Sequence, residues 1–196
     1  MRGLRRIALV AALVAATLAP AALAGLPGEI TSKAPWAPEW THLRERLAAI
    51  GLPALQQEGL VLHIHQHLDI WVNGRQVEVP AGIGFGVQPD GKTVTFISDL
   101  HTHRPDGILH VESPKKQVFT LGQFFDVWGL RFTATCIGGH CNSGKSVLRV
   151  WANGKPVTGD PRKLPLTSHE EIVVVYGTGK QTPAKIPASF KFDPGL

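Results

Sequence analysis

The chain has 196 residues, which is enough for one ordinary domain with a hydrophobic core. Its 20 Lys and Arg exceed its 15 Asp and Glu, but three of the arginines precede an N-terminal apolar run, and without them the balance is 17 against 15, or +2. So small an excess, with no cluster of Lys and Arg, argues against a nucleic-acid-binding protein.

Residues 1–24 have the parts of a secretory signal peptide: an Arg-rich start, an apolar run from Ile7 to Ala19, and the small-x-small site Ala22-Leu23-Ala24. We therefore predict a secreted or periplasmic protein whose mature chain begins at Gly25. The apolar run is short for a membrane span and no other stretch is apolar enough, so we expect no stable membrane insertion.

The rest of the chain divides into a leader, a domain and a tail. Residues 25–37 are rich in Pro and Gly and predict a flexible leader, residues 38–178 a single histidine-rich domain, and the Pro- and Lys-rich residues 179–196 an extended tail. Pro38 at a first helical position predicts that the domain opens with a helix, which Gly51 ends.

Strands follow the first helix. Residues 62–72 alternate as a strand does and run into Asn73-Gly74, a strong hairpin signal. Further strands are predicted at 93–97, 107–112 and 131–135. Thr120-Leu121-Gly122-Gln123 has the form of a capping box and predicts a short second helix that Gly129 ends. The β-branched run 172–176 predicts a central buried strand.

A second Asn-Gly turn, at Asn153-Gly154, makes the segment 146–177 resemble 62–80, either as a pseudo-repeat of two hairpins or because both hairpins use good turn chemistry. Many strands and two short helices predict an α+β domain with a mainly antiparallel or mixed sheet. The second half resembles β-grasp modules of exported proteins, and an irregular β-sandwich is the alternative.

The histidines are concentrated in one part of the chain. His63, His65 and His67 occupy alternate positions of a predicted strand, so their side chains share one face. His101 and His103 repeat that alternation, and His110 shares a face with Glu112. Imidazole is the commonest protein metal ligand, and imidazoles with a carboxylate suit Cu(II), Zn(II) or Ni(II). The six histidines therefore predict a divalent-metal site, with copper or zinc as the expected ion.

The acids near these histidines are further candidates, either as ligands or as partners of an imidazole N–H. They are Asp69, Asp99, Asp106 and Glu112, and for Asp106, which precedes Gly107, a role in a turn is favoured. His42 lies off the predicted helix stripe, and His42 and His169 are expected to lie outside the metal site.

Several longer motifs carry a resemblance. The runs His63-x-His65-x-His67-Leu68, Leu100-His101-Thr102-His103, 107–113 (GILHVES) and 119–129 (FTLGQFFDVWG) are similar to those of a group of secreted bacterial and archaeal histidine-rich proteins to which no activity is assigned. The resemblance covers most of the mature chain and implies no particular reaction.

Cys136 and Cys141 enclose four residues, Ile137-Gly138-Gly139-His140. In an exported protein a disulfide is the expected state, because Gly138-Gly139 allows the tight turn that brings the two Cα atoms together. A soft Cys-His-Cys site for Cu(I) is the alternative.

The residues therefore predict an exported protein that binds copper or zinc, for handling or buffering, whose partners are the ion and another exported protein. Two other classes stay open. One is an extracytoplasmic metalloenzyme, hydrolytic or copper-redox, which requires an open coordination position beside a pocket. The other is a partner-binding β module whose histidines sense pH and are dispersed over the surface.

Overall fold

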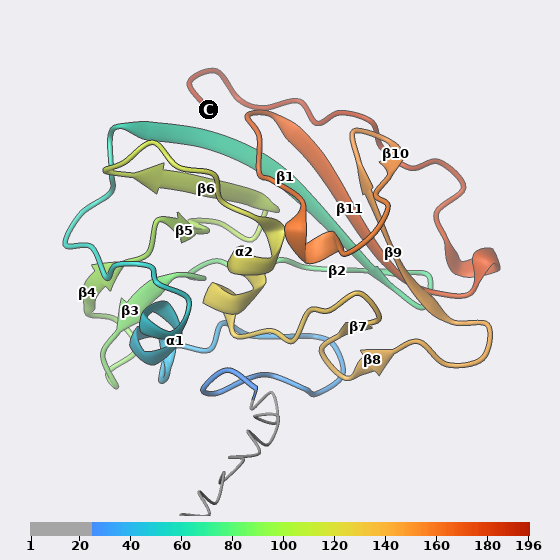
Figure 1. Cartoon of the computed structure of the whole chain (residues 1–196), viewed down its shortest axis with the longest axis horizontal. Coiled ribbons are helices and arrows are strands. Elements are labelled where there is room, and N and C mark those ends of the chain that lie inside the picture. Colours follow the sequence, from blue (N-terminus) through green and yellow to red (C-terminus); the bar gives the residue numbers. More distant parts are fainter. Residues whose placement is uncertain (1–24) are drawn as a thin grey trace, which may run out of the picture.

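A computed structural model describes residues 25–196; the predicted signal peptide, 1–24, lies outside the described residues. The described chain is α+β, as predicted: two short α-helices pack against a seven-stranded mixed sheet, and two two-stranded sheets lie beside it (Figure 1). The helices are α1 (Leu43–Ala49) and α2 (Leu121–Trp128), with 3-10 turns η1 (Pro161–Lys163) and η2 (Gly179–Gln181).

The strands follow in chain order. They are β1 (Leu62–Val72), β2 (Arg75–Val77), β3 (Phe85–Val87), β4 (Val94–Ile97), β5 (Leu100–His101), β6 (Ile108–Ser113), β7 (Cys136–Ile137), β8 (His140–Cys141), β9 (Val147–Ala152), β10 (Lys155–Pro156) and β11 (Glu170–Gly177). The main sheet has the order β10-β9-β11-β1-β6-β5, and β2 pairs with β1.

Strand β11 joins the two halves of the chain. It pairs in parallel with β1 and antiparallel with β9, and all eight of its residues are buried, which confirms the predicted central strand. The second half therefore shares its sheet with the first instead of forming a separate module. The two Asn-Gly hairpins, β1–β2 and β9–β10, form as predicted, since Asn73 and Asn153 adopt φ of 52° and 49°. Whether they are a repeat remains a prediction.

The hydrophobic core lies between one face of the sheet and α1 and α2. Helix α2 begins with the predicted capping box, in which Thr120 accepts from the Gln123 backbone N–H, and ends at Gly129 in the left-handed region. Its aromatic residues Phe124, Phe125 and Trp128 are fully buried against each other and against Phe132. The even-numbered face of β1 contributes Leu68 and Ile70 to the same core, so the odd-numbered face points away from the helices.

Three sequence expectations are wrong. Helix α1 begins at Leu43 instead of Pro38. The residues between them make other hydrogen bonds, because the Glu39 carboxylate accepts from the backbone N–H of His42 and the Trp40 indole N–H donates to the carbonyl of Gly82. Residues 25–37 are not a flexible leader: Trp36 is 3% exposed within the core. Residues 131–135 form no strand and contribute only the isolated bridge of Phe132 with Ile137, since the tight hairpin β7–β8 follows at once.

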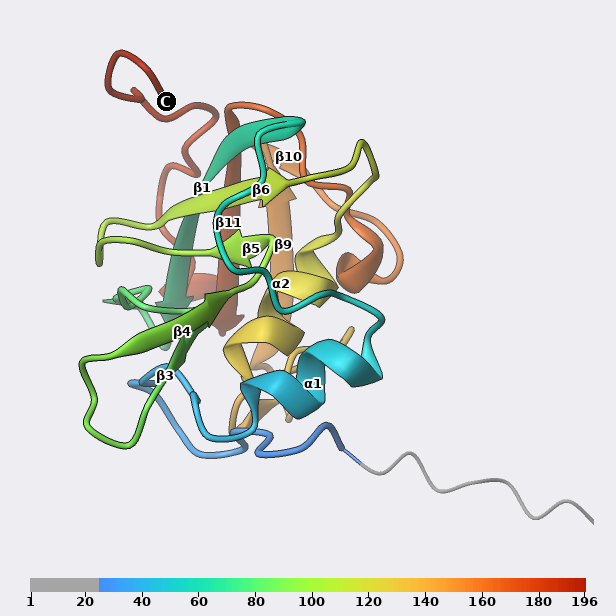
Figure 2. The same ribbon diagram turned by 90° about the vertical axis from the view of Figure 1, so that its left-hand side faces the viewer.

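The C-terminal tail runs over the side of the sheet opposite the helices (Figure 2). There Phe190 stacks on His67 with ring centroids 3.7 Å apart, and Phe192 stacks on His169 at 4.7 Å. Within residues 25–196, no helix has the length and apolar character that a membrane span requires.

Candidate metal centre

Strand β1 arranges its histidines by alternation alone. His63, His65 and His67 share the sheet face that points away from α1 and α2. Ile64 and Leu68 point the other way, into the core between the sheet and the helices. The side chains of His65 and His67 are buried, whereas His63, near the start of the strand, leaves 47% of its side chain exposed.

The sheet register adds ligand-capable side chains from two further strands. Strand β6 pairs antiparallel with β1, so that His110 lies opposite His65 and Glu112 opposite His63. Strand β5 pairs with the other edge of β6 and places His101 opposite His110. Because directly opposite residues project from the same face, the strand pairings collect histidines from three strands on one patch.

The first group of metal-ligating atoms comprises His63, His65, His110 and Glu112, whose ligand atoms all lie within 4.8 Å of one another. The Nε2 atoms of His63 and His65 are 3.2 Å apart. Glu112 Oε1 lies 3.3 Å from His63 Nε2 and 3.1 Å from His110 Nδ1.

The second group comprises His101, His103, His110 and Glu112, and so shares two residues with the first. The Nε2 atoms of His101 and His103 are 3.1 Å apart. A further carboxylate, Glu58, comes from the loop before β1 and places its Oε1 3.3 Å from His103 Nε2 and 3.9 Å from His101 Nε2. Nothing in the sequence pattern singled out Glu58.

The third group separates His67 from the other predicted ligands. His67 Nδ1 lies 2.8 Å from Glu171 Oε2, and Asp69 completes a set of three ligand-capable side chains. Glu171 comes from β11, through the pairing that places it opposite His67. Since His67 already has a hydrogen-bonded carboxylate partner and is covered by Phe190, a buried histidine–glutamate pair explains this group without an ion.

Burial keeps two of the cluster imidazoles neutral. Burial, reinforced by the neighbouring His110 and His63, lowers the pKa of His65 to about 4. Burial lowers the pKa of His101 to about 3, against the opposing attraction of Glu112. Burial also lowers the pKa of His103. A neutral imidazole presents a lone pair, which is the form that binds a metal ion.

The two carboxylates respond in opposite directions. Burial raises the pKa of the Glu112 carboxyl, but the hydrogen bond from His110 and the other neighbouring histidines outweigh this effect and bring the pKa to about 2. Burial and the nearby Glu112 carboxylate raise the pKa of Glu58. Glu112 is therefore the permanent negative charge of the cluster, and the histidines surround it.

A small pocket adjoins the first group. It has a volume of about 240 Å³ and is lined by His63, His65, Ser168, His169 and the C-terminal residues 195–196. His169, which we expected outside the site, is thus a neighbour of His63 and His65, although its ligand atoms belong to none of the three groups. Its Nε2 lies 2.8 Å from the carbonyl oxygen of Leu196. His42 lies on α1's N-cap, bonded to Glu39, and belongs to none of these groups either.

The remaining predicted acids have structural positions. Asp106 accepts from the backbone N–H of Ile108 and from Arg104, in the turn that Gly107 completes at φ 79°. Asp69 accepts from the amide of Gln76. Asp99 is fully buried, and burial raises its pKa.

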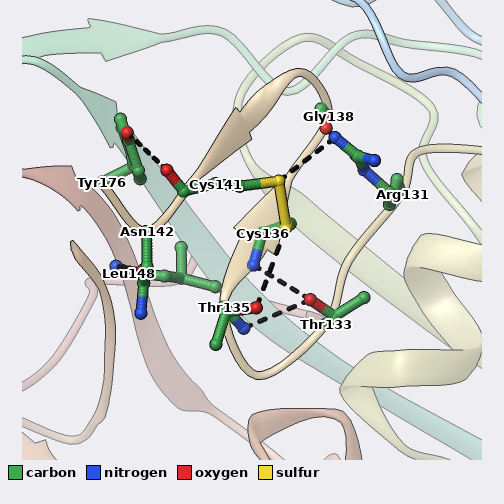
Figure 3. The surroundings of a disulfide bond; sticks show 9 residues. All are labelled: Arg131, Thr133, Thr135, Cys136, Gly138, Cys141, Asn142, Leu148 and Tyr176. Atoms are coloured by element: carbon green, nitrogen blue, oxygen red, sulfur yellow. Dashed lines mark hydrogen bonds between the residues drawn. A yellow bond between two sulfur atoms is a disulfide. The ribbon is translucent and has the colours of Figure 1, made fainter. Parts of the chain in front are cut away.

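Cys136 and Cys141 face each other across the hairpin β7–β8, with their sulfur atoms at disulfide distance (Figure 3). Arg131 donates to Cys141 Sγ, and the Tyr176 hydroxyl donates to the carbonyl of Cys141. His140 is directed away from the sulfur pair, against Trp36 and Tyr176. The arrangement matches the expected disulfide, and among residues 25–196 no metal-capable group includes either sulfur atom.

Comparison with protein-family models, with curated proteins and with solved structures finds no match to this chain. The case for a function therefore depends on the geometry of the cluster.

Proposed function

We propose that this is an exported protein that binds copper or zinc through the histidines of β1, β5 and β6, and that it handles or buffers the ion. The observation that carries the proposal is that five imidazoles and Glu112 meet on one sheet face. Glu112 Oε1 lies 3.1 to 3.9 Å from nitrogens of His63, His101 and His110. His65 and His103 join the cluster through Nε2 atoms 3.2 Å from His63 and 3.1 Å from His101. A buried histidine with a structural role is ordinarily isolated from other histidines and hydrogen-bonded to one partner, as His67 is to Glu171.

The spacing of the nitrogens suits coordination. Two imidazole nitrogens bound at about 2.0–2.1 Å to one ion lie about 2.9 Å apart for a right angle at the metal and about 3.4 Å apart for a tetrahedral one. The two Nε2 pairs, at 3.2 Å and 3.1 Å, fall within that range. Without an ion, each pair can share only one proton between two facing nitrogens, so its stabilisation is small.

The donor set bears on the kind of ion. Imidazoles with a carboxylate and no thiolate suit Cu(II), Zn(II) or Ni(II) better than Cu(I) or the hard ions Mg²⁺ and Ca²⁺. The cysteines, at disulfide distance from each other, contribute no soft ligand to the cluster.

Export is part of the proposal. It is supported by the signal-peptide pattern of residues 1–24 and by a cysteine pair at disulfide distance, since disulfides persist in oxidising compartments. Membership of the group of secreted histidine-rich proteins rests on the sequence motifs alone.

A metalloenzyme is the second candidate, and the pocket beside His63 and His65 is the observation that favours it. Its volume of about 240 Å³ lies below the 300–1,000 Å³ of typical small-molecule sites, so only a small substrate would fit there. The pH-sensing module required dispersed histidines, whereas five of them meet in one cluster.

Calorimetry with Zn(II) and Cu(II) tests the proposal. The double variant H63A/H103A removes two ligands whose side chains are 47% and 40% exposed, so folding should be preserved. Loss of an outer-shell partner alone costs about 10–100-fold in metal affinity, so loss of two direct ligands should cost more than that. The matched control is H42A, whose side chain is 42% exposed and lies outside the cluster. Equal affinities in both variants would overturn the proposal.

A further inference from the structure

The cluster has more ligands than one ion can use. His63, His65, His101, His103, His110, Glu58 and Glu112 offer seven side chains, whereas a structural zinc ion takes four and a catalytic one leaves a position open. The excess suggests a division of the ligands between two ions.

The division is visible in the geometry. Ligand atoms bound at about 2.0–2.2 Å to one ion cannot be more than about 4.4 Å apart. Among the described residues, His63 and His65 belong to one group within 4.8 Å and His101 and His103 to another, and no group contains both pairs. With the side chains as they lie, a single ion therefore cannot bind all four of these imidazoles.

Glu112 lies between the pairs. Its Oε1 is 3.3 Å from His63 Nε2 on one side and 3.9 Å from His101 Nε2 on the other. The Glu112 carboxylate is 5% exposed and belongs to both groups. His110 also belongs to both groups, and its Nδ1 lies 3.1 Å from Glu112 Oε1. All of these contacts are made by Oε1, and a carboxylate oxygen has two lone pairs, so Glu112 has the position of a shared ligand.

Glu58 completes only one of the two pairs. Its Oε1 lies near both His101 and His103, at 3.9 Å and 3.3 Å. Without Glu58, the His101–His103 pair has only the shared residues as further ligands. Glu58 and Glu112 both approach His101, each with its Oε1 3.9 Å from His101 Nε2.

From this arrangement we propose a two-ion centre, in which one divalent ion binds His63 and His65, a second binds His101, His103 and Glu58, and Glu112 is shared. The inference rests on the proposed metal-binding function and adds the second ion, the role of Glu58 and the shared carboxylate. Two positive ions close together are stabilised by the carboxylates, which together carry two negative charges.

Stoichiometry separates this inference from the function it rests on. The metal-free full chain is titrated with Cu(II) or Zn(II), desalted and analysed for bound metal. We expect two ions per chain in the wild type and one in E58Q, H103A and H63A. All three side chains are 40–47% exposed, so these substitutions should leave folding intact. The exposed Glu78 provides the matched control E78Q, which should keep two ions.

Electron paramagnetic resonance of the Cu(II)-loaded protein tests the sharing of Glu112. Two Cu(II) ions joined by a carboxylate are magnetically coupled, so the wild type should show a coupled spectrum and H103A the spectrum of an isolated Cu(II). One ion per chain in the wild type, or two ions with uncoupled spectra, would overturn the two-ion centre and leave metal binding standing. No bound ion would overturn the proposed function itself.

Discussion

The stability of the metal-free protein should fall as the pH drops below 6.5, because of His65 and His101. Burial lowers the pKa of His65 to about 4 and that of His101 to about 3, from a value of 6.5 in an exposed histidine. Between pH 6.5 and 4 the unfolded chain therefore binds protons at both residues while the folded chain does not. Each pH unit lost in this window favours the unfolded state.

The magnitude follows from the linkage. One proton bound only by the unfolded chain changes the free energy of unfolding by about 1.4 kcal/mol per pH unit. Allowing for partial protonation near pH 6.5, the two histidines together should cost about 3 kcal/mol between pH 6.5 and 5. That is a large share of the roughly 5–15 kcal/mol that stabilises an ordinary domain.

Carboxyl groups with shifted pKa values also contribute to the pH dependence of the free energy of unfolding. Glu112, with its pKa lowered to about 2, adds a loss of stability only below its ordinary value of 4.5. Burial raises the pKa of Asp99 and Glu170, so these groups bind protons more readily in the folded chain and oppose the loss. The contribution of the histidines is therefore measured as a difference between wild type and a variant that keeps these acids.

Urea unfolding between pH 5 and 7.5, with a chelator present, measures that difference. In the variant H65Q/H101N both titrating rings are absent, so its free energy of unfolding should depend on pH less steeply than that of the wild type. H42Q, at a half-buried position outside the cluster, should keep the wild-type slope. The same slope in H65Q/H101N as in the wild type would refute the assignment of buried neutral histidines.

Four further outcomes are expected. R46M should lower the free energy of unfolding by about 3–5 kcal/mol in urea, since the buried Arg46 pairs with Glu39 and donates to the α2 carbonyls of Asp126 and Val127, whereas the exposed R44M should cost much less. Replacing Cys136 and Cys141 by Ser should cost less than the roughly 3 kcal/mol of a 15-residue loop, and non-reducing peptide mapping that finds free thiols would contradict the disulfide. F190A should lose about 0.5–1.5 kcal/mol of stacking on His67 and leave the number of bound ions unchanged. The intact mass of the exported protein should show the loss of residues 1–24, and a mass that still includes them would contradict the cleavage site.

Local chemistry in the sequence was sufficient for several elements. The Asn-Gly pairs predicted both hairpins because few other dipeptides accept positive φ at two successive positions. The capping box at Thr120 and the left-handed Gly129 predicted the limits of α2, and alternation predicted that His63, His65 and His67 share a face. These features depend on neighbours within a few residues, so the order of residues contains the necessary information.

Predictions failed where the position of a residue depends on a partner far away in the sequence. The sequence of residues 25–37 predicts a flexible leader, but Trp36 lies in the core of the domain. It packs there against Trp128 and His140, which are about a hundred residues away in the chain. The start of α1 moved to Leu43 because Trp40 binds a carbonyl 42 residues away. Composition and spacing contain no trace of such contacts.

The candidate site has the same division. The sequence by itself predicted that the candidate ligands are the histidines of one strand face and those of the second cluster. Only the tertiary structure decided how these side chains are grouped: the register of β1 with β6 placed Glu112 opposite His63, the pairing with β11 assigned His67 to Glu171, and a loop brought in Glu58. A strand's pattern defines which side chains share a face, but the partner strand and its register define which of them meet, because those are properties of long-range hydrogen bonding.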